Sequence, residues 1–160
     1  MIIRSITATD IPAAAELLRD SWRYHAQHSR LQSLKAMMDY PIETHLQERL
    51  TLSEWATFVA DDGEIIGVVM CCIEDAPSYY KFPKQLFVHE IAVAEDHRRQ
   101  GIAEKLLHRA EEFASSQDIS LLVADIYDFN TSSQSLFAKD GFNPDISYWY
   151  KVSDKGEHHE

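Results

Sequence analysis

Residues 86–104 read LFVHEIAVAEDHRRQGIAE, and this stretch decides the fold of the 160-residue chain. Residues 86–94 are mostly apolar and predict a β-strand. A basic loop with a single glycine follows over residues 96–101, and the apolar positions after it recur at helical spacing over residues 102–116. The residues expected on the buried side of this helix are Ile102, Leu106, Leu107, Ala110 and Phe113. The stretch therefore predicts a strand, a basic loop and a helix in direct succession.

The basic loop stands at a helix N-terminus, where backbone N–H groups have no intrahelical partner and carry a partial positive charge that suits a phosphate. Gly101 lets a ligand approach the backbone closely, and Ala103 keeps the first helical turn uncluttered. Arg98 and Arg99 add positive charge. A solvated basic cap on an ordinary turn is the alternative interpretation. The loop lacks the glycine spacing of dinucleotide-binding and P-loop motifs, which disfavours hydride transfer and nucleotide hydrolysis.

The other elements follow from short apolar runs, helical spacing and turn residues. Strands are predicted over residues 2–6, 55–60, 65–73, 120–127 and 146–152, and helices after Thr9 or Asp10, over 29–50 with a break near Pro41, and over 131–140. The strand at 120–127 should run parallel to that at 86–94, because a helix connects them. The order β-α-α-β-β-β-α-β-α-β predicts an α/β (α+β) fold with a mixed, mostly antiparallel sheet and helices on both faces. We expect one domain over residues 1–152 and a polar tail over residues 153–160.

The formal net charge of −11 disfavours nucleic-acid binding, which needs clustered Lys and Arg. An acidic surface could steer a cationic substrate, although solubility alone also explains it. No apolar run approaches the ~20 residues of a membrane span, and the N-terminus lacks the apolar stretch of a secretory signal. The sequence therefore predicts a cytoplasmic protein with no membrane partner. The adjacent Cys71 and Cys72 are expected to be small, buried strand side chains in a reducing compartment.

The segment Arg98-Arg99-Gln100-Gly101-Ile102-Ala103 resembles the [QR]-x-x-G-x-[GA] signature of the GCN5-related N-acetyltransferases, the GNAT family. Ile91-Ala92-Val93 resembles the central strand of that family. Asn130 followed by residues 135–142, SLFAKDGF, resembles its second motif, which has an Asn, a short helix and a Gly-Phe ending. These segments occur in the family's order over most of the chain, so the resemblance is specific.

This resemblance implies two central parallel strands that splay apart around the pantetheine of acetyl-CoA. The backbone of Ile91, Ala92 and Val93 would pair with the pantetheine amides. The pyrophosphate would lie against backbone N–H groups in the loop and first helical turn, which comprise Arg98, Arg99, Gln100, Gly101, Ile102, Ala103 and Glu104. Asn130, Ser133 and Phe137 would lie along the thiol end or the arm of the cofactor. No metal is expected, since His25 and His28 have no third ligand nearby.

Acetyl transfer needs a neutral amine, and a general base near neutrality helps to remove its proton. Glu90 and His89 stand beside the cofactor strand, but strand alternation places them on opposite faces unless a bulge intervenes. By resemblance to polyamine acetylases either could act as the base, while a plain surface contact explains them equally well. Phe137 stands where many family members have the Tyr that protonates the leaving thiolate. Ser133 and Tyr127 are the nearest alternative hydroxyls.

The resemblance predicts an N-acetyltransferase acting on a primary amine, and the acidic balance favours a small cationic one. The expected acceptor side includes acidic and aromatic candidates, namely Glu43, Glu48, Asp75, Tyr79, Tyr80 and Trp149. A non-catalytic acyl-CoA-binding or sensor module is the competing hypothesis. A homodimer is compatible with the resemblance, since many relatives are dimers.

Overall fold

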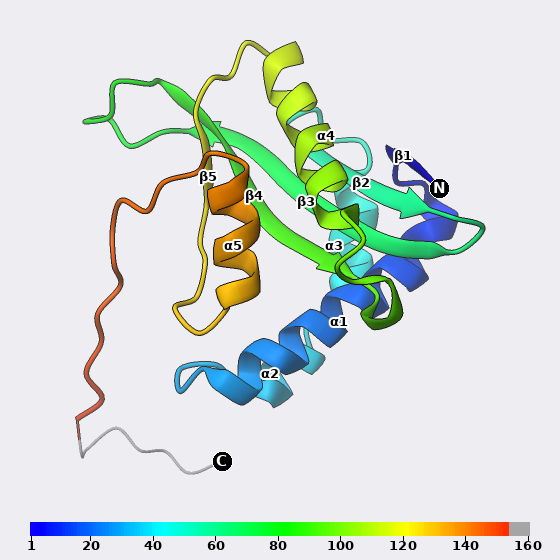
Figure 1. The fold of residues 1–160 in the computed structure, drawn as a ribbon, viewed down its shortest axis with the longest axis horizontal. Coiled ribbons are helices and arrows are strands. Elements are labelled where there is room, and N and C mark those ends of the chain that lie inside the picture. The colour runs from blue at the N-terminus through cyan, green and yellow to red at the C-terminus, as the bar shows by residue number, and fades with distance from the viewer. Residues whose placement is uncertain (154–160) are drawn as a thin grey trace.

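A computed structural model of the chain describes residues 1–153. Its five strands form one sheet in the order β1-β2-β3-β4-β5 (Figure 1). They are β1 Ile2–Ser5, β2 Trp55–Asp61, β3 Ile65–Asp75, β4 Lys84–Val93 and β5 Leu122–Ala124. The first four strands pair antiparallel and β5 pairs parallel to β4. This arrangement confirms the predicted mixed, mostly antiparallel sheet.

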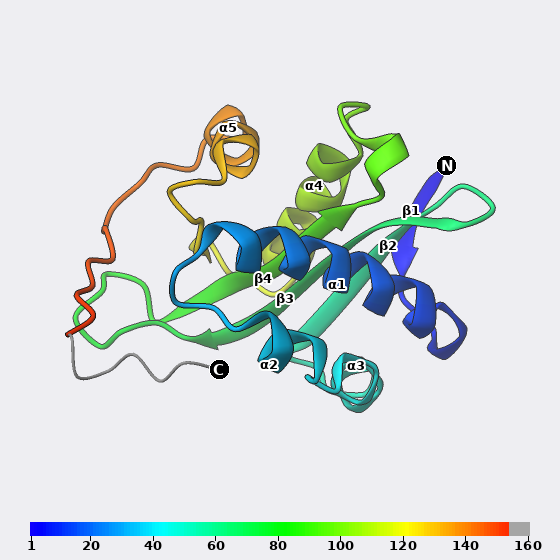
Figure 2. The same cartoon turned by 90° about the horizontal axis from the view of Figure 1, so that it is seen from below.

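Helices cover both faces of the sheet, as predicted (Figure 2). On one face lie α1 Ile11–His28, α2 Leu34–Met38 and α3 Ile42–Arg49, and on the other lie α4 Ile102–Ser116 and α5 Thr131–Lys139. The break near Pro41 separates α2 from α3 as expected, because proline lacks an N–H and restricts the residue before it. None of the helices within residues 1–153 combines the length and the hydropathy of a membrane span.

Each face of the sheet has its own apolar core. Helix α4 buries Leu106, Leu107 and Ala110 against one face, and α1 buries Ala14 and Leu18 against the other. Full burial of a leucine side chain stabilises the fold by about 1.5–3 kcal/mol. Cys71 and Cys72 are free and buried in β3, as the sequence predicts.

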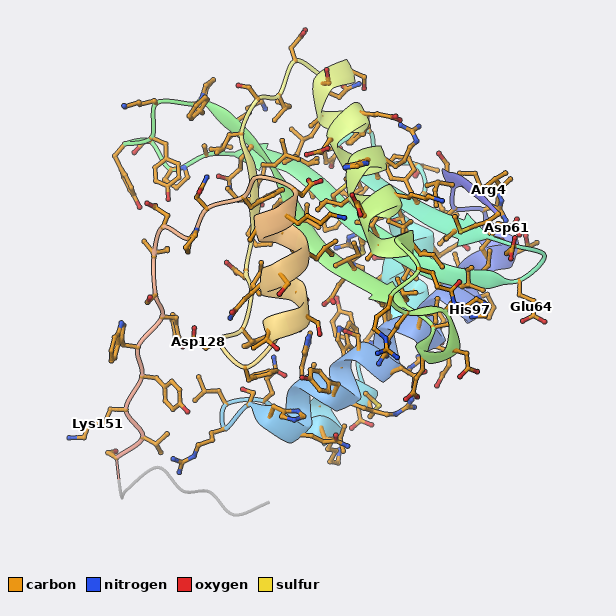
Figure 3. All side chains as sticks on the ribbon, viewed as in Figure 1. Arg4, Asp61, Glu64, His97, Asp128 and Lys151 are labelled. Atoms are coloured by element: carbon orange, nitrogen blue, oxygen red, sulfur yellow. The ribbon has the colours of Figure 1, made fainter. Side chains whose placement is uncertain are left out.

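Arg4 ties the first strand to the start of α1 and to the end of β2. Its guanidinium donates to Asp10 at 2.7 and 2.9 Å and to Asp61 at 2.9 Å, and Figure 3 shows Arg4 and Asp61 pointing toward one another. Asp10 is buried and also accepts the backbone N–H of Thr7. The hydrogen bond from Arg4 lowers the pKa of Asp10 below its ordinary value, so this carboxyl stays charged at neutral pH.

Two predicted strands differ from the structure. The strand expected over residues 120–127 is hydrogen-bonded only over Leu122–Ala124, because β4 and β5 diverge beyond those residues. The prediction of a strand over residues 146–152 is wrong, because these residues pair with no strand in the described chain and their side chains are largely exposed. The predicted tail at 153–160 lies outside the described residues except for Ser153.

Gly67 in β3 sets how closely α4 approaches the sheet. A Cβ added there would lie 3.0 Å from Leu106 Cδ1 and 3.2 Å from Ile102 Cγ2, which is tighter than ordinary packing. We expect Gly67→Val to lower the free energy of unfolding by about 1–3 kcal/mol, because overpacking strains a close-packed core. Gly67→Ala should cost less. Urea denaturation of the two variants checks this, and a Val variant as stable as the parent would show that α4 can shift freely.

Candidate functional site

The sheet opens between β4 and β5. The two strands pair over three residues, from Leu86 with Leu122 to Val88 with Ala124. Beyond Val88, β4 continues to Val93 while paired with β3 alone in the described chain. Backbone N–H and C=O groups on the outer side of residues 89–93, apart from the Val93 carbonyl that accepts from Arg98, are therefore available to a ligand that can lie along the strand.

A β-bulge at His89 determines which side chains face the helices at this opening. Met70 is opposite Glu90 and Cys71 is opposite Val88, so His89 is the extra residue. The Glu90 carboxylate accepts a hydrogen bond of 2.8 Å from the indole Nε1 of Trp22 in α1. The ring of His89 stacks on Trp55, with centroids 5.0 Å apart, on the same face. The bulge therefore brings both candidate bases to the face covered by α1 and α3, where regular alternation would have separated them.

A narrow cleft with a volume of about 50 Å³ occupies the wedge between the strands. It is lined by residues from α1, β4, the end of β5, the segment after β5, and α5. The predicted site residues that line it are His89, Ile91, Tyr127, Asn130, Ser133 and Phe137. Its small volume means that a ligand arm entering there would push the walls apart.

Asn130 and His25 form a polar contact across the cleft. The Asn130 Oδ1 accepts the backbone N–H of Ser133 at 3.2 Å and so caps α5, while its Nδ2 lies 3.3 Å from His25 Nε2. Burial lowers the pKa of His25, and the positive charge of His28 adds to this effect. A neutral His25 ring can accept the Asn130 amide hydrogen. Sequence reasoning missed this role, although the spacing of His25 from Trp22 places both residues on one face of α1.

Glu90 follows His89 on β4 but is not among the residues that line the cleft; its carboxylate lies against Trp22 of α1. Burial raises its pKa to about 7, while the hydrogen bond from Trp22 partly opposes the rise. Desolvation also lowers the pKa of His89, whose ring is enclosed by Trp55 and Phe87 although the residue is exposed overall. A carboxyl group that titrates near neutrality can take up and release a proton, as a general base requires.

Tyr127 lines the cleft with its hydroxyl engaged by Gln32, whose amide donates to the phenolic oxygen. Burial is the main cause that raises the Tyr127 pKa above its ordinary value, so the hydroxyl keeps its proton at neutral pH. Phe137 is buried and packs edge-on against Phe142, with centroids 4.9 Å apart. Tyr127 and Ser133 are therefore the predicted hydroxyl-bearing residues that reach the cleft.

The loop before α4 has the backbone shape of an anion site. Arg99 and Gly101 have φ values of 60° and 76°, and Gly101 is the N-cap of α4. Residues in the left-handed region beside right-handed or extended ones turn successive N–H groups toward one concavity. A Cβ added to Gly101 would meet no heavy atom within 4 Å, so the space before the helix is open. The Arg98 Nε donates a hydrogen bond of 3.2 Å to the Val93 carbonyl oxygen.

Other predicted residues contribute side chains elsewhere. Ile102 and Ala92 are buried in the two cores, so only their backbones could contact a ligand. Glu104 binds Lys139 at 2.7 Å and so links α4 to α5. Gln100 donates to the Asp96 carbonyl at 3.3 Å.

The acidic residues expected on the acceptor side are largely paired with cations. Glu43 binds Arg19 at 2.6 Å, Asp75 binds Lys84 at 3.3 Å, and Glu48 lies 3.9 Å from Arg49. Tyr79 and Trp149 are 84% and 90% exposed, and neither is among the residues that line the cleft. These side chains therefore add little to the opening as it stands.

His25 and His28 are not part of a metal-ligand set in the part of the chain that the structure describes. One group of potential ligands lies elsewhere, where His108, Glu111 and Asp140 come within 4.8 Å of one another between α4 and the end of α5. His108 Nε2 and Asp140 Oδ1 are already hydrogen-bonded at 2.8 Å.

Glu90→Gln tests the burial of this carboxyl group. A folded-state pKa near 7, above the unfolded value, means that Glu90 contributes least to stability above pH 7, where burial of its charge opposes folding. The variant keeps an oxygen for Trp22, so it should stabilise the protein by up to about 3 kcal/mol at pH 8 and much less at pH 5. Urea denaturation at both pH values measures this, with exposed Glu64→Gln as the control. An equal effect at both pH values would contradict the assignment.

Solved structures with this fold include several acetyltransferases. The tetramutant of a Bacillus halodurans protein aligns with a TM-score of 0.82 and 17% identity, covering 96% of this chain and 100% of that one. Aminoglycoside 6'-N-acetyltransferase from Acinetobacter haemolyticus aligns at 0.70 and 19%, over 96% of this chain and 100% of its own. A predicted acetyltransferase from Clostridium acetobutylicum, solved with acetyl-CoA, aligns at 0.71 and 16%, over 99% of each chain.

No curated protein matches the sequence. The model of the acetyltransferase (GNAT) family matches residues 11–142, which contain the bulged strand, the loop before α4 and both helices that border the cleft. The chain therefore belongs to the GNAT acetyltransferase family.

Proposed function

We propose that the protein transfers an acetyl group from acetyl-CoA to a primary amine of a small cationic molecule. The single observation that supports this proposal is a continuous backbone track, which we define as the unpaired edge of β4 (residues 89–93) and the loop that follows it up to Gly101. Membership of the GNAT family implies acetyl-CoA as the donor. The track suits the two polar parts of acetyl-CoA. The exposed backbone groups of the strand can pair with the amides of the pantetheine arm, and the helix N-terminus can bind the pyrophosphate.

Residues of this chain would bind the cofactor mainly through their backbones. We assign the pantetheine contacts to Ile91, Ala92 and Val93, and the pyrophosphate contacts to the N–H groups of residues 99–104. Bound acetyl-CoA supplies an activated thioester whose C–S bond breaks as the new C–N bond forms. Asn130 keeps α5 in place through its cap on Ser133. Phe137 forms an apolar wall of the cleft.

Glu90 acts as the general base in this proposal. A primary ammonium has a pKa of about 10.4 and must lose a proton before its nitrogen can attack. The Glu90 carboxylate, with a pKa of about 7, can accept that proton directly or through a water molecule. Because His89 lies on the same face, it is the alternative base.

Tyr127 and Ser133 are the proposed proton donors to the departing sulfur. Both line the cleft, and the raised pKa of Tyr127 keeps its proton available. Water can share the task, because a thiolate with a pKa of about 8.5 leaves without much assistance. The absence of a Tyr at position 137 is also the observation that favours the competing function, a cofactor-binding module without turnover.

Two observations support the proposal of a cationic acceptor: the net charge of −11 and the substrate class of two proteins with a similar fold. Two proteins with a similar fold are aminoglycoside acetyltransferases. Thiol release from acetyl-CoA, measured over a panel of cationic, neutral and anionic amines, tests the proposal. Turnover limited to neutral or anionic amines would refute the acceptor class. Binding without turnover of any amine would favour the non-catalytic module.

Gly101→Val should abolish cofactor binding. The added side chain would enter the open space before α4, and we expect the dissociation constant for coenzyme A to rise at least about 100-fold. Gly63→Val is a matched control, since Gly63 has φ of +91° and an equally open Cβ position but lies in the β2–β3 hairpin. Both variants should carry similar backbone strain of about 1–2 kcal/mol. Calorimetric titration with coenzyme A separates the two, and unchanged binding in Gly101→Val would contradict the assignment.

Tyr127→Phe should lower turnover at least tenfold and alter the alkaline limb of the pH–rate profile, because a general acid is typically worth ~10²–10⁴-fold. Ser133→Ala should have the smaller effect if Tyr127 is the main donor. Phe137→Tyr should leave turnover unchanged or raise it. Steady-state kinetics from pH 6 to about pH 10 distinguish these outcomes. A parent without turnover that gains it through Phe137→Tyr would overturn the catalytic proposal.

A further inference from the structure

One face of α4 carries a row of three titratable side chains that reach the end of α5. Glu104, His108 and Glu111 are four and three residues apart, so they lie above one another on the helix. Glu104 binds Lys139, the last residue of α5, at 2.7 Å. His108 Nε2 lies 2.8 Å from Oδ1 of Asp140, which is the C-cap of α5. The row therefore joins the two helices through polar contacts.

Glu111 and Asp140 bring two carboxyl groups together beside His108. One ligand atom from each of these three residues lies within 4.8 Å of the others. No Lys or Arg among residues 1–153 forms an ion pair with Glu111 or Asp140. Burial raises the pKa of Glu111, and the neighbouring Asp140 carboxyl raises it further, as expected for two acids that compete for one proton. A protonated His108 would neutralise only one of the two charges, so the cluster favours a further cation.

Asp140 supplies a second observation that is independent of this proximity. Its side chain is 7% exposed, and its Oδ2 is buried without a hydrogen-bond partner in the part of the chain that the structure describes. A buried carboxylate oxygen normally accepts a hydrogen bond or coordinates a metal ion. Because Oδ1 of the same carboxyl group contacts His108, the unpartnered oxygen belongs to the cluster.

We propose that His108, Glu111 and Asp140 bind a divalent transition-metal ion, for which zinc is the best fit. Zinc accepts imidazole nitrogen and carboxylate oxygen at about 2.0–2.2 Å, with water in the fourth position of a tetrahedron. Ligand atoms in such a site lie roughly 3.4 Å apart. Atoms within 4.8 Å of one another therefore need only small side-chain rotations, for which the half-exposed His108 ring has room. Magnesium prefers an octahedron of oxygens, so the imidazole favours zinc over magnesium.

The proposed metal site is separate from the cofactor cleft but shares two helices with it. Its three ligands are not among the residues that line the cleft. α4 begins after Gly101, at the proposed pyrophosphate site, and α5 provides Ser133 and Phe137 to the cleft wall. A bound ion therefore fixes the spacing of the two helices. Metal binding itself does not depend on the proposed acetyl transfer.

Calorimetric titration of the full chain with zinc near neutral pH measures the site, and we expect one saturable ion per chain. His108→Ala, Glu111→Gln and Asp140→Asn should each raise the dissociation constant at least about 30-fold, because loss of a residue that only orients a ligand already costs about 10–100-fold. Glu112→Gln is the matched control. It makes the same change one residue along α4, where Glu112 pairs with Arg109 at 3.3 Å, and it should leave the affinity unchanged.

Thermal unfolding shows whether a variant has lost the metal site or the fold. Zinc should raise the unfolding temperature of the parent and of Glu112→Gln by the same amount, because an ion that binds the native state stabilises it by mass action. Asp140→Asn keeps the size of the side chain and an oxygen for His108. This variant should therefore unfold cooperatively without zinc and show no rise when zinc is added.

Four results would overturn the proposal. Absence of saturable binding at millimolar zinc would mean that the cluster holds no ion. Equal weakening by Glu112→Gln would mean that general negative charge attracts the metal. Unchanged binding in the three ligand variants would place the ion elsewhere, for example at His158 and His159. Magnesium binding as tight as that of zinc would mean that the imidazole is not a ligand.

Discussion

Between Val88 and Glu90, β4 carries one residue more than the strand it pairs with, and the geometry of the opening depends on that extra residue. A bulge increases local twist and bends its strand. The pairing of β4 with β5 stops at Val88, next to the bulge, and the wedge begins there. The same bulge turns Glu90 toward Trp22, while His89 remains on the face covered by α1 and α3. Without it, one of the two side chains would point into the core beneath α4.

Burial of Glu90 shows how stability and chemistry oppose each other in this site. A carboxylate removed from water is destabilised unless donors replace the lost hydration, and Trp22 supplies one such donor. The pKa of about 7 shows that the cost of burying the charge exceeds the stabilisation by this one hydrogen bond. A second strong donor would make the carboxylate a weaker base, and loss of the hydrogen bond from Trp22 alone would raise its pKa further. α1 therefore adjusts the basicity of a group that β4 positions.

The sequence predicted the parts of this site that depend on local pattern. The apolar strand, the basic loop with Gly101 and the amphipathic α4 each leave a signal within a few residues, and the structure has all three. The bulge left none, because an extra residue in one strand is visible only against its partner. The contact of Trp22 with Glu90 spans 68 positions and depends on how α1 crosses the sheet. The length of β5 and the path of the chain after Phe142 are likewise set by tertiary neighbours, so a strand-like pattern at 146–152 could not predict whether a partner strand is present.

Low sequence identity alongside a shared fold follows from how the loop before α4 and the open strand are built. A structure with 17% identity aligns over nearly the whole chain at a TM-score of 0.82. Backbone N–H groups at a helix N-terminus and along an unpaired strand edge need a conformation rather than particular side chains, apart from a residue such as Gly101 that must reach positive φ without a Cβ. Side chains between the sheet and the helices α1 and α3, including Trp22, His45, Trp55 and Glu90, are free of that constraint. Differences in acceptor substrate among relatives should therefore arise from side chains on this face of the sheet. The backbone groups along the unpaired edge of β4 should stay the same.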